Sequence, residues 1–229
     1  MKKCIAFTLA ETLIVMGVIG VVAALTLPNL NSSTSNKEKV AKVQKIYQNL
    51  NDAIGRAEAV YGPYDEWFVN DGNDAAAKAK RTGERISEFM KLSKECKMAT
   101  GQKCFSNSTD NAANYYKIIT ADGTSIAFAQ NEIVEIDLDG PTKGSNKNGV
   151  DIFDSVLSYN SSKRAFLPGC GEGQGFSSIT YELFENPNKC GFSWIVNVGN
   201  MDYLKAGTDG KCKNNTSITL DGVSNTTCK

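Results

Sequence analysis

The amino-acid sequence predicts an α+β fold in which a long N-terminal helix packs on an antiparallel β-sheet and disulfide bonds staple the C-terminal region. Three observations indicate this fold. A long apolar segment is followed by an apolar stripe of helical period, several short strand patterns lie in the middle of the chain, and six cysteines follow residue 95.

Composition limits both the number of domains and the class of function. The chain has 229 residues, of which 41% are hydrophobic and 22% charged, enough for one full-sized domain and an appendage. Lys+Arg 25 and Asp+Glu 25 cancel, so no broad cationic surface is available for nucleic acid. Histidine is absent, which excludes Ser-His-Asp and Cys-His catalysis and imidazole-ligated zinc. We expect a protein that is not an enzyme.

The N-terminal segment is long and apolar enough to form a membrane-spanning helix. Residues 7–27 carry mostly apolar side chains, and 21 residues at about 1.5 Å per residue give about 31 Å of helix. Lys2 and Lys3 precede the segment and predict that the N-terminus stays in the cytoplasm.

Three interpretations of this segment are open. It fits a secretory signal peptide that is cleaved after Ala23, or a simple signal anchor. The third interpretation gives a role to Glu11, a carboxylate just before the apolar run, because an ionisable group in a membrane helix is costly and is usually functional.

A short motif supports the third interpretation. Residues 6–11, AFTLAE, follow a short basic leader and precede LIVMGVIGVVAALTLP, and this pattern resembles the N-terminal processing signal of type IV pilins and type II secretion pseudopilins. The resemblance implies cleavage between Ala6 and Phe7 by a prepilin peptidase, followed by N-methylation of Phe7. Glu11 falls on the glutamate of the family, and Pro28 on a proline that kinks the helix in many members. Ala6 departs from the usual glycine.

The resemblance also implies a pilin-like fold and a structural role. The chain would be a filament subunit of a type IV pilus or a type II secretion system, with Glu11 paired to the Phe7 ammonium of a neighbouring copy. Its partners would be other subunits, the prepilin peptidase and an inner-membrane assembly platform. Before assembly it would cross the inner membrane once with its head in the periplasm, and afterwards it would lie in a filament in the periplasm or on the cell surface. The alternative is a secreted, disulfide-rich binding domain with an ordinary signal peptide.

These expectations divide the chain into a leader (1–6), a transmembrane and assembly helix (7–28), an amphipathic second half of the helix (29–62) and a globular head (63–229). Pro28 and the polar residues 29–36 predict that the helix breaks or loosens here. A stripe with steps of three and four then resumes and ends at Gly62; its members are Val40, Val43, Tyr47, Leu50, Ile54, Ala57 and Tyr61. A coiled-coil seam has the same spacing, but three heptads favour packing against a sheet.

The head should contain one helix and several strands. Residues 74–92 predict a helix, with Gly83 as a weak point. Residues 115–120 and 124–130 predict a hairpin around a turn at 121–123. Further strands are predicted at 132–138, 151–159 and 192–198.

The cysteines predict disulfide bonds. Cys4 lies in the leader, and its removal leaves an even number. Nearest-neighbour pairing is favoured: Cys96 with Cys104, Cys170 with Cys190, and Cys212 with Cys228. Reduced, buried thiols are the alternative.

The loop at residues 137–151 is rich in oxygen donors and makes calcium a candidate ligand, although no cofactor is otherwise indicated. The candidate ligands are Asp137, Asp139, Asn146 and Asp151. Lys143 and Lys147 in the same loop would oppose a cation. The alternative is a long surface loop built from Asx turns and glycines.

Overall fold

The structure is a computed structural model of the chain that describes residues 9–129, 133–160, 165–169, 187–207, 211–212 and 228. Within these ranges the side chains of residues 11, 22–33, 133, 155–160, 167–169 and 187–189 are not described. The chain divides into an N-terminal unit, Met1–Glu38, and a second unit, Lys39–Lys229, which we call the head unit.

The first element is a single helix, α1, which runs from Leu9 to Tyr61. The predicted break at Pro28 is therefore wrong. A proline inside a helix removes one hydrogen bond and crowds the preceding turn, but the hydrogen bonds on both sides still favour helix, so the chain continues through it. The helix ends at Gly62, which adopts a positive φ of 82° and donates its N–H to the carbonyl of Glu58 at 3.0 Å.

The part of α1 in the head unit presents the predicted apolar stripe to the core. Its fully buried side chains are Val43, Ile46, Leu50, Ala53, Ile54 and Ala57. Val40 and Tyr47 pack against the same core, whereas Tyr61 is 39% exposed. The core also includes the strand residues Ile118, Ile126 and Ile136, so packing of the helix against a sheet, the favoured interpretation, is confirmed.

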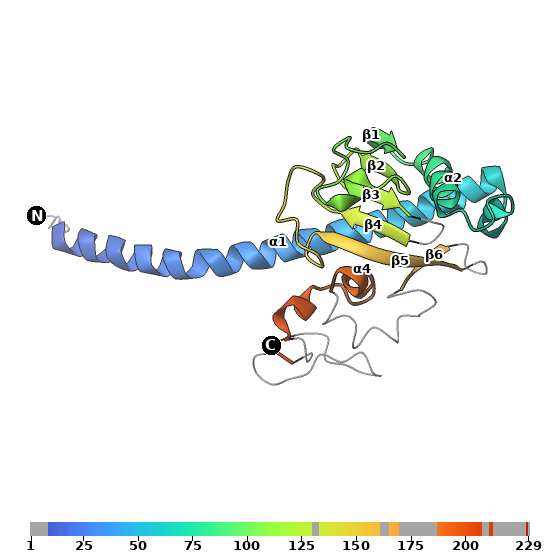
Figure 1. Ribbon diagram of the computed structural model, residues 1–229. Helices are drawn as coiled ribbons and strands as arrows, with labels where there is room; N and C mark the ends of the chain where they lie inside the picture. Colours follow the sequence, from blue (N-terminus) through green and yellow to red (C-terminus); the bar gives the residue numbers. More distant parts are fainter. Residues whose placement is uncertain are drawn as a thin grey trace, which may run out of the picture. The chain divides into compact units, whose positions relative to one another are not determined.

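Among the described residues the sheet has six antiparallel strands in chain order. Figure 1 shows them side by side. They are β1 (Leu92–Lys97), β2 (Tyr116–Thr120), β3 (Ser125–Phe128), β4 (Ile133–Asp137), β5 (Ile152–Asn160) and β6 (Ala165–Gly169). The predicted α+β class, the hairpin of β2 and β3, and the strands β4 and β5 are confirmed. Gly123 in the hairpin turn has a φ of 87°, as such a turn requires.

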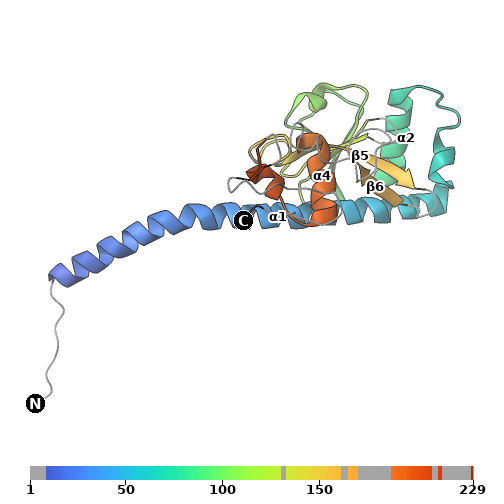
Figure 2. The same cartoon turned by 90° about the horizontal axis from the view of Figure 1, so that it is seen from below.

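Two further helices lie against the sheet at different places (Figures 1 and 2). Helix α2 (Ala75–Ser87) contacts β2 and β3, and helix α4 (Pro187–Val198) contacts β5. The Asp74 side chain caps α2 by accepting the N–H groups of Ala76 and Ala77. Short 3-10 turns complete the described chain: η1 (Tyr64–Phe68), η2 (Ser108–Asn111) and η4 (Asp202–Lys205).

Four elements differ from the sequence prediction. Residues 192–198 form the end of α4 instead of a strand, and α2 ends at Ser87, after which β1 begins at Leu92. The run around Phe192 and Trp194 is buried on nearly every side, and such a run shows no periodicity that separates a strand from a helix. Strand β6 was not predicted.

Candidate functional site

The N-terminal part of α1 exposes large apolar side chains around its circumference. Eight large apolar side chains between Leu9 and Val21 are each 54 to 80% exposed: Leu9, Leu13, Ile14, Val15, Met16, Val18, Ile19 and Val21. At 3.6 residues per turn these positions are distributed around the whole helix. A Cβ added at Gly17 or Gly20 would meet no atom of the described chain within 4 Å, so packing within the chain does not require either glycine.

Most of the other predicted N-terminal site residues lie outside the residues that the structure describes. Ala6 and Phe7 precede the described residues, and the side chains of Glu11 and of residues 22–33 are not described. Their predicted roles in cleavage, methylation and pairing stay predictions. No helix in the described part of the chain is both long enough and apolar enough to cross a membrane.

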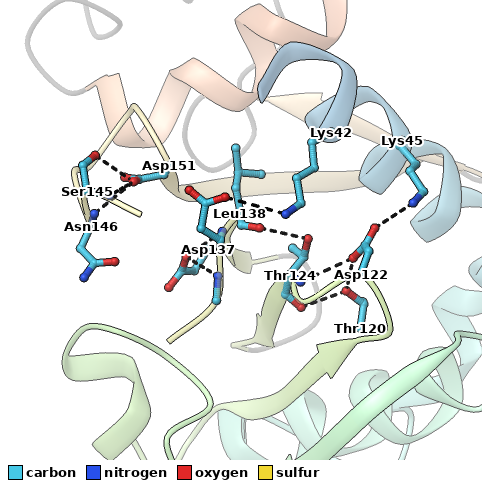
Figure 3. A network of polar contacts seen from close by, with 12 residues as sticks. Lys42, Lys45, Thr120, Asp122, Thr124, Asp137, Leu138, Ser145, Asn146 and Asp151 are labelled. Carbon is cyan, nitrogen blue, oxygen red and sulfur yellow. Dashed lines mark hydrogen bonds and ion pairs between the residues drawn. The ribbon is translucent and has the colours of Figure 1, made fainter. Parts of the chain in front are cut away.

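In the head unit, the loop between β4 and β5 folds around the carboxylate of Asp151 (Figure 3). One oxygen, Oδ2, accepts the N–H of Ser145 at 2.7 Å, the hydroxyl of Ser145 at 2.8 Å and the N–H of Asn146 at 3.0 Å. The other oxygen accepts the N–H of Lys147 at 2.6 Å. Asp151 is 1% exposed, so a buried charge is balanced by four donors from its own loop.

Asp137 is buried at the end of β4 and also accepts hydrogen bonds from protein donors. It accepts the N–H groups of Asp139 and Gly140 at 3.2 and 3.0 Å, and the hydroxyl of Ser106 at 2.7 Å. Burial raises the pKa of Asp137 because these donors do not fully replace water, and the nearby Asp151 charge acts in the same direction.

Two lysines of α1 contact the loops at this end of the sheet (Figure 3). Lys42 Nζ lies 3.9 Å from Asp139 Oδ1, and Lys45 Nζ lies 2.9 Å from Asp122 Oδ2 in the hairpin turn. Burial raises the pKa of Asp122, but hydrogen bonds from Thr120 and Lys45 outweigh it, and the pKa lies below its ordinary value. The lysines therefore connect α1 to two neighbouring loops.

The structure does not assemble the four predicted calcium ligands. Among the described residues, no group of three His, Cys, Asp or Glu side chains could hold a metal ion. Asp137 and Asp151 already accept three and four hydrogen bonds, and Asp139 faces the Lys42 ammonium. Asn146 has a positive φ of 50° and contributes its backbone N–H to Asp151. The loop thus fits the alternative, a surface loop held by its own turns.

Two of the predicted disulfide bonds are confirmed, Cys96 with Cys104 and Cys212 with Cys228. Cys190 is buried and disulfide-bonded, but its predicted partner Cys170 lies outside the described residues.

The Cys96–Cys104 bond anchors a loop that covers a fully buried lysine. Lys117 on β2 is 0% exposed, and its ammonium donates to the carbonyl oxygens of Ala112 at 2.6 Å and Asp110 at 3.4 Å. The Asp110 carboxylate accepts the N–H groups of three consecutive loop residues, beginning with Lys103 at 2.9 Å and Cys104 at 2.6 Å. The loop therefore places polar groups over the side of β2 on which Lys117 lies.

Sequence reasoning missed the residues that organise this end of the head: Lys42, Lys45, Asp122 and Ser106. The 3-residue spacing of the two lysines on a helix does place them on one face, but the carboxylates that they meet are far away in the sequence.

Comparisons with protein-family models, with curated proteins and with solved structures found no match to the chain.

Proposed function

We propose that the chain is a structural subunit, a pilin or pseudopilin, of a filament in the bacterial envelope, and that it has no catalytic activity of its own. A prepilin peptidase removes residues 1–6 and methylates Phe7. The N-terminal part of α1 first lies in the inner membrane and then forms the centre of the filament. The head unit remains outside the membrane.

The observation that carries this proposal is the apolar surface around the N-terminal part of α1. A helix that is apolar on every side is stable when other apolar surfaces bury it. A bilayer or a bundle of parallel helices from other copies provides such burial. Gly17 and Gly20 support the second environment, since their faces are open for a neighbouring backbone.

Glu11 sets the position of each helix relative to its neighbour in the proposed bundle. Cleavage before Phe7 creates an α-ammonium at the positive end of the helix dipole, which an acidic group stabilises. In an apolar surrounding a lone carboxylate is costly, so Glu11 of one copy would pair with the Phe7 ammonium of the next.

The N-terminus of the mature protein tests the proposal directly. The full chain is produced together with a prepilin peptidase, and its N-terminus is determined by Edman degradation and intact mass. A chain that starts at N-methylated Phe7 is expected. A chain that starts near Ala24 would instead identify a secreted protein with an ordinary signal peptide.

A Glu11→Gln variant tests the pairing. The variant is expected to remain in the membrane fraction and to enter filaments poorly, because the amide cannot balance the ammonium. Glu38→Gln, the same change at an exposed position in α1, is the matched control and should assemble normally. Normal assembly of the Glu11→Gln variant would contradict the pairing.

A further inference from the structure

The head unit has two grooves of opposite charge beside the segment that joins α2 to β1. The first, which we call the basic groove, has a volume of about 520 Å³ and lies between α1 and residues 89–91; its charged lining residues are Lys45, Asp52, Arg56, Lys91 and Asp122. The second, the acidic groove, has a volume of about 480 Å³; its charged lining residues are Glu84, Glu88, Glu95 and Lys97. No residue lines both.

The basic groove has one more cation than it has carboxylates. Lys45 pairs with Asp122 at 2.9 Å, and Arg56 pairs with Asp52 at 3.7 Å. Lys91 is exposed, and no carboxylate among the described residues forms an ion pair with its ammonium. The groove therefore offers a positive charge beside the partly buried Phe89 and Met90.

The acidic groove carries two carboxylates at the carboxyl end of α2. Glu84 lies in the last turn and Glu88 is the C-cap residue, and both are exposed. Negative charge at this end of a helix opposes the helix dipole and destabilises the helix. Lys80, the partner of Glu84 at 3.9 Å, is itself largely exposed, so this pair adds little.

Glu95, in contrast, is satisfied within the head unit. It accepts the hydroxyl of Tyr116 at 2.5 Å and that of Ser87 at 3.2 Å. Glu88 accepts the hydroxyl of Tyr61 and Glu84 pairs with Lys80, but both carboxylates are exposed, so they are the ones within reach of an external cation. Their position is unfavourable in the isolated chain and becomes favourable when a cation binds there.

We propose that these grooves form one contact between two copies of this chain, in which Glu84 and Glu88 of one copy enter the basic groove of the next and meet Lys91. This inference rests on the proposed filament, which supplies the second copy. A contact between two different surfaces is head-to-tail, and it builds a filament when its rotation does not close a ring. Opposite charge selects the correct pairing of surfaces and excludes contact between like grooves.

Zero-length cross-linking tests the contact. Unlabelled and ¹⁵N-labelled full-length chains are co-assembled and treated with a carbodiimide, which joins a carboxylate to an amine only at contact distance. Mixed-isotope peptides that join Lys91 to Glu84 or Glu88 are expected, and their yield should fall as salt is added.

Charge reversal supplies the matched variants. Lys91→Glu alone and Glu84→Lys alone should each lower the yield of mixed-isotope cross-links between the grooves at least about tenfold, because like charges then meet. The double variant should restore contact, detected by cross-links between the exchanged residues. Lys143→Glu, an equal charge change in the exposed loop after β4, should leave the yield unchanged.

The outcomes separate this inference from the proposed function. Mixed-isotope cross-links that map elsewhere on the head unit would overturn the groove contact and leave the filament proposal intact. Loss of the cross-links in the double variant as well would also overturn it. Complete absence of mixed-isotope cross-links, together with a mature N-terminus near Ala24, would overturn both.

Discussion

The side-chain amide of Asn51 on α1 binds both backbone polar groups of Phe166 on β6. Asn51 Oδ1 accepts the Phe166 N–H at 2.7 Å, Asn51 Nδ2 lies 3.5 Å from the Phe166 carbonyl oxygen, and Tyr47 donates its hydroxyl to the same oxygen at 2.8 Å. Because β6 is the last strand of the described sheet, the helix takes the place of a further strand at this residue.

We therefore expect Asn51→Ala to destabilise the head unit. The Phe166 N–H would lose its acceptor in a buried position, which costs about 1–3 kcal/mol. Urea unfolding measures the free energy, and the slope with urea should not change. Gln48→Ala, an exposed change one turn earlier in α1, is the control and should stay within about 0.5 kcal/mol of the parent. Equal free energies of unfolding for the two variants would show that the contact of the Asn51 amide with the Phe166 backbone does not stabilise the head unit.

The sequence predicts the interior strands well and the sheet edges poorly. Strands β2 to β5 alternate or carry β-branched residues, and a hairpin turn with glycine marks the first pair. Strand β1, LSKECK, buries only Cys96, and β6 contains Pro168. Edge strands carry charges and prolines that weaken the apolar pattern, so the pattern alone does not reveal them.

The same limit applies to the candidate sites. The N-terminal motif is local, so the sequence identifies it directly. The contact of Lys45 with Asp122 joins residues 77 positions apart, and no periodicity reports such a pair. The calcium prediction depended on which residues occupy the loop, whereas the folded loop turns its own N–H groups toward Asp151.

Gly83 was predicted as a weak point of its helix, and the structure gives it a packing role instead. A Cβ at Gly83 would lie 2.1 Å from the ring of Tyr116, which is 1% exposed. We expect Gly83→Ala to destabilise the head unit by about 1–3 kcal/mol, although alanine favours helix. Thermal and urea unfolding provide the measurement.

Gly55→Ala is the matched control because it makes the same change inside α1, where an added Cβ would meet nothing within 4 Å. It should stabilise the protein by about 0.5–1 kcal/mol. Opposite signs for the two variants are the expected result. A stabilising Gly83→Ala would contradict the close approach of α2 and Tyr116.

The loop between β4 and β5 should not need calcium, because protein donors and Lys42 already balance its carboxylates. Neither EDTA nor millimolar calcium should change the Tm of the parent protein. Lys42→Ala removes the positive charge beside Asp139 but leaves Asp137 and Asp151 hydrogen-bonded, so one partly exposed carboxylate is too few for calcium and the Tm of this variant should not respond to calcium either.

Lys45→Ala is the control, since it removes an equivalent charge from α1 but pairs with Asp122 outside that loop. The free energy of unfolding of this variant should fall by about 0.2–1 kcal/mol, and its Tm should not respond to calcium. If calcium raised the Tm of the parent protein, the carboxylates of this loop would not be balanced by protein donors and Lys42, and the predicted metal site would be supported.

Glu135 should make the stability of the head unit fall as pH rises. It faces Asp154 directly across β4 and β5, and it accepts the hydroxyl of Thr109. Burial raises the pKa of Glu135, and the Asp154 charge raises it further. The folded state therefore binds the proton more tightly than the unfolded state does.

The sign of the pH effect follows from that difference. Below the unfolded pKa of about 4.3, Glu135 is protonated in both the folded and the unfolded state and costs no stability. As the pH rises from there through the raised folded pKa, the folded state has to release its proton at a cost, and stability is lost.

Glu135→Gln removes this titration and keeps an amide oxygen for Thr109. Below pH about 4.3 the variant and the parent should have the same free energy of unfolding, and from there to neutrality the variant should be the more stable. Urea unfolding at a series of pH values measures the difference. Glu66→Gln, at an exposed position in η1, is the control and should show no such divergence. Parallel curves for parent and Glu135→Gln would mean that Thr109 and the other donors fully offset burial and the facing Asp154 charge.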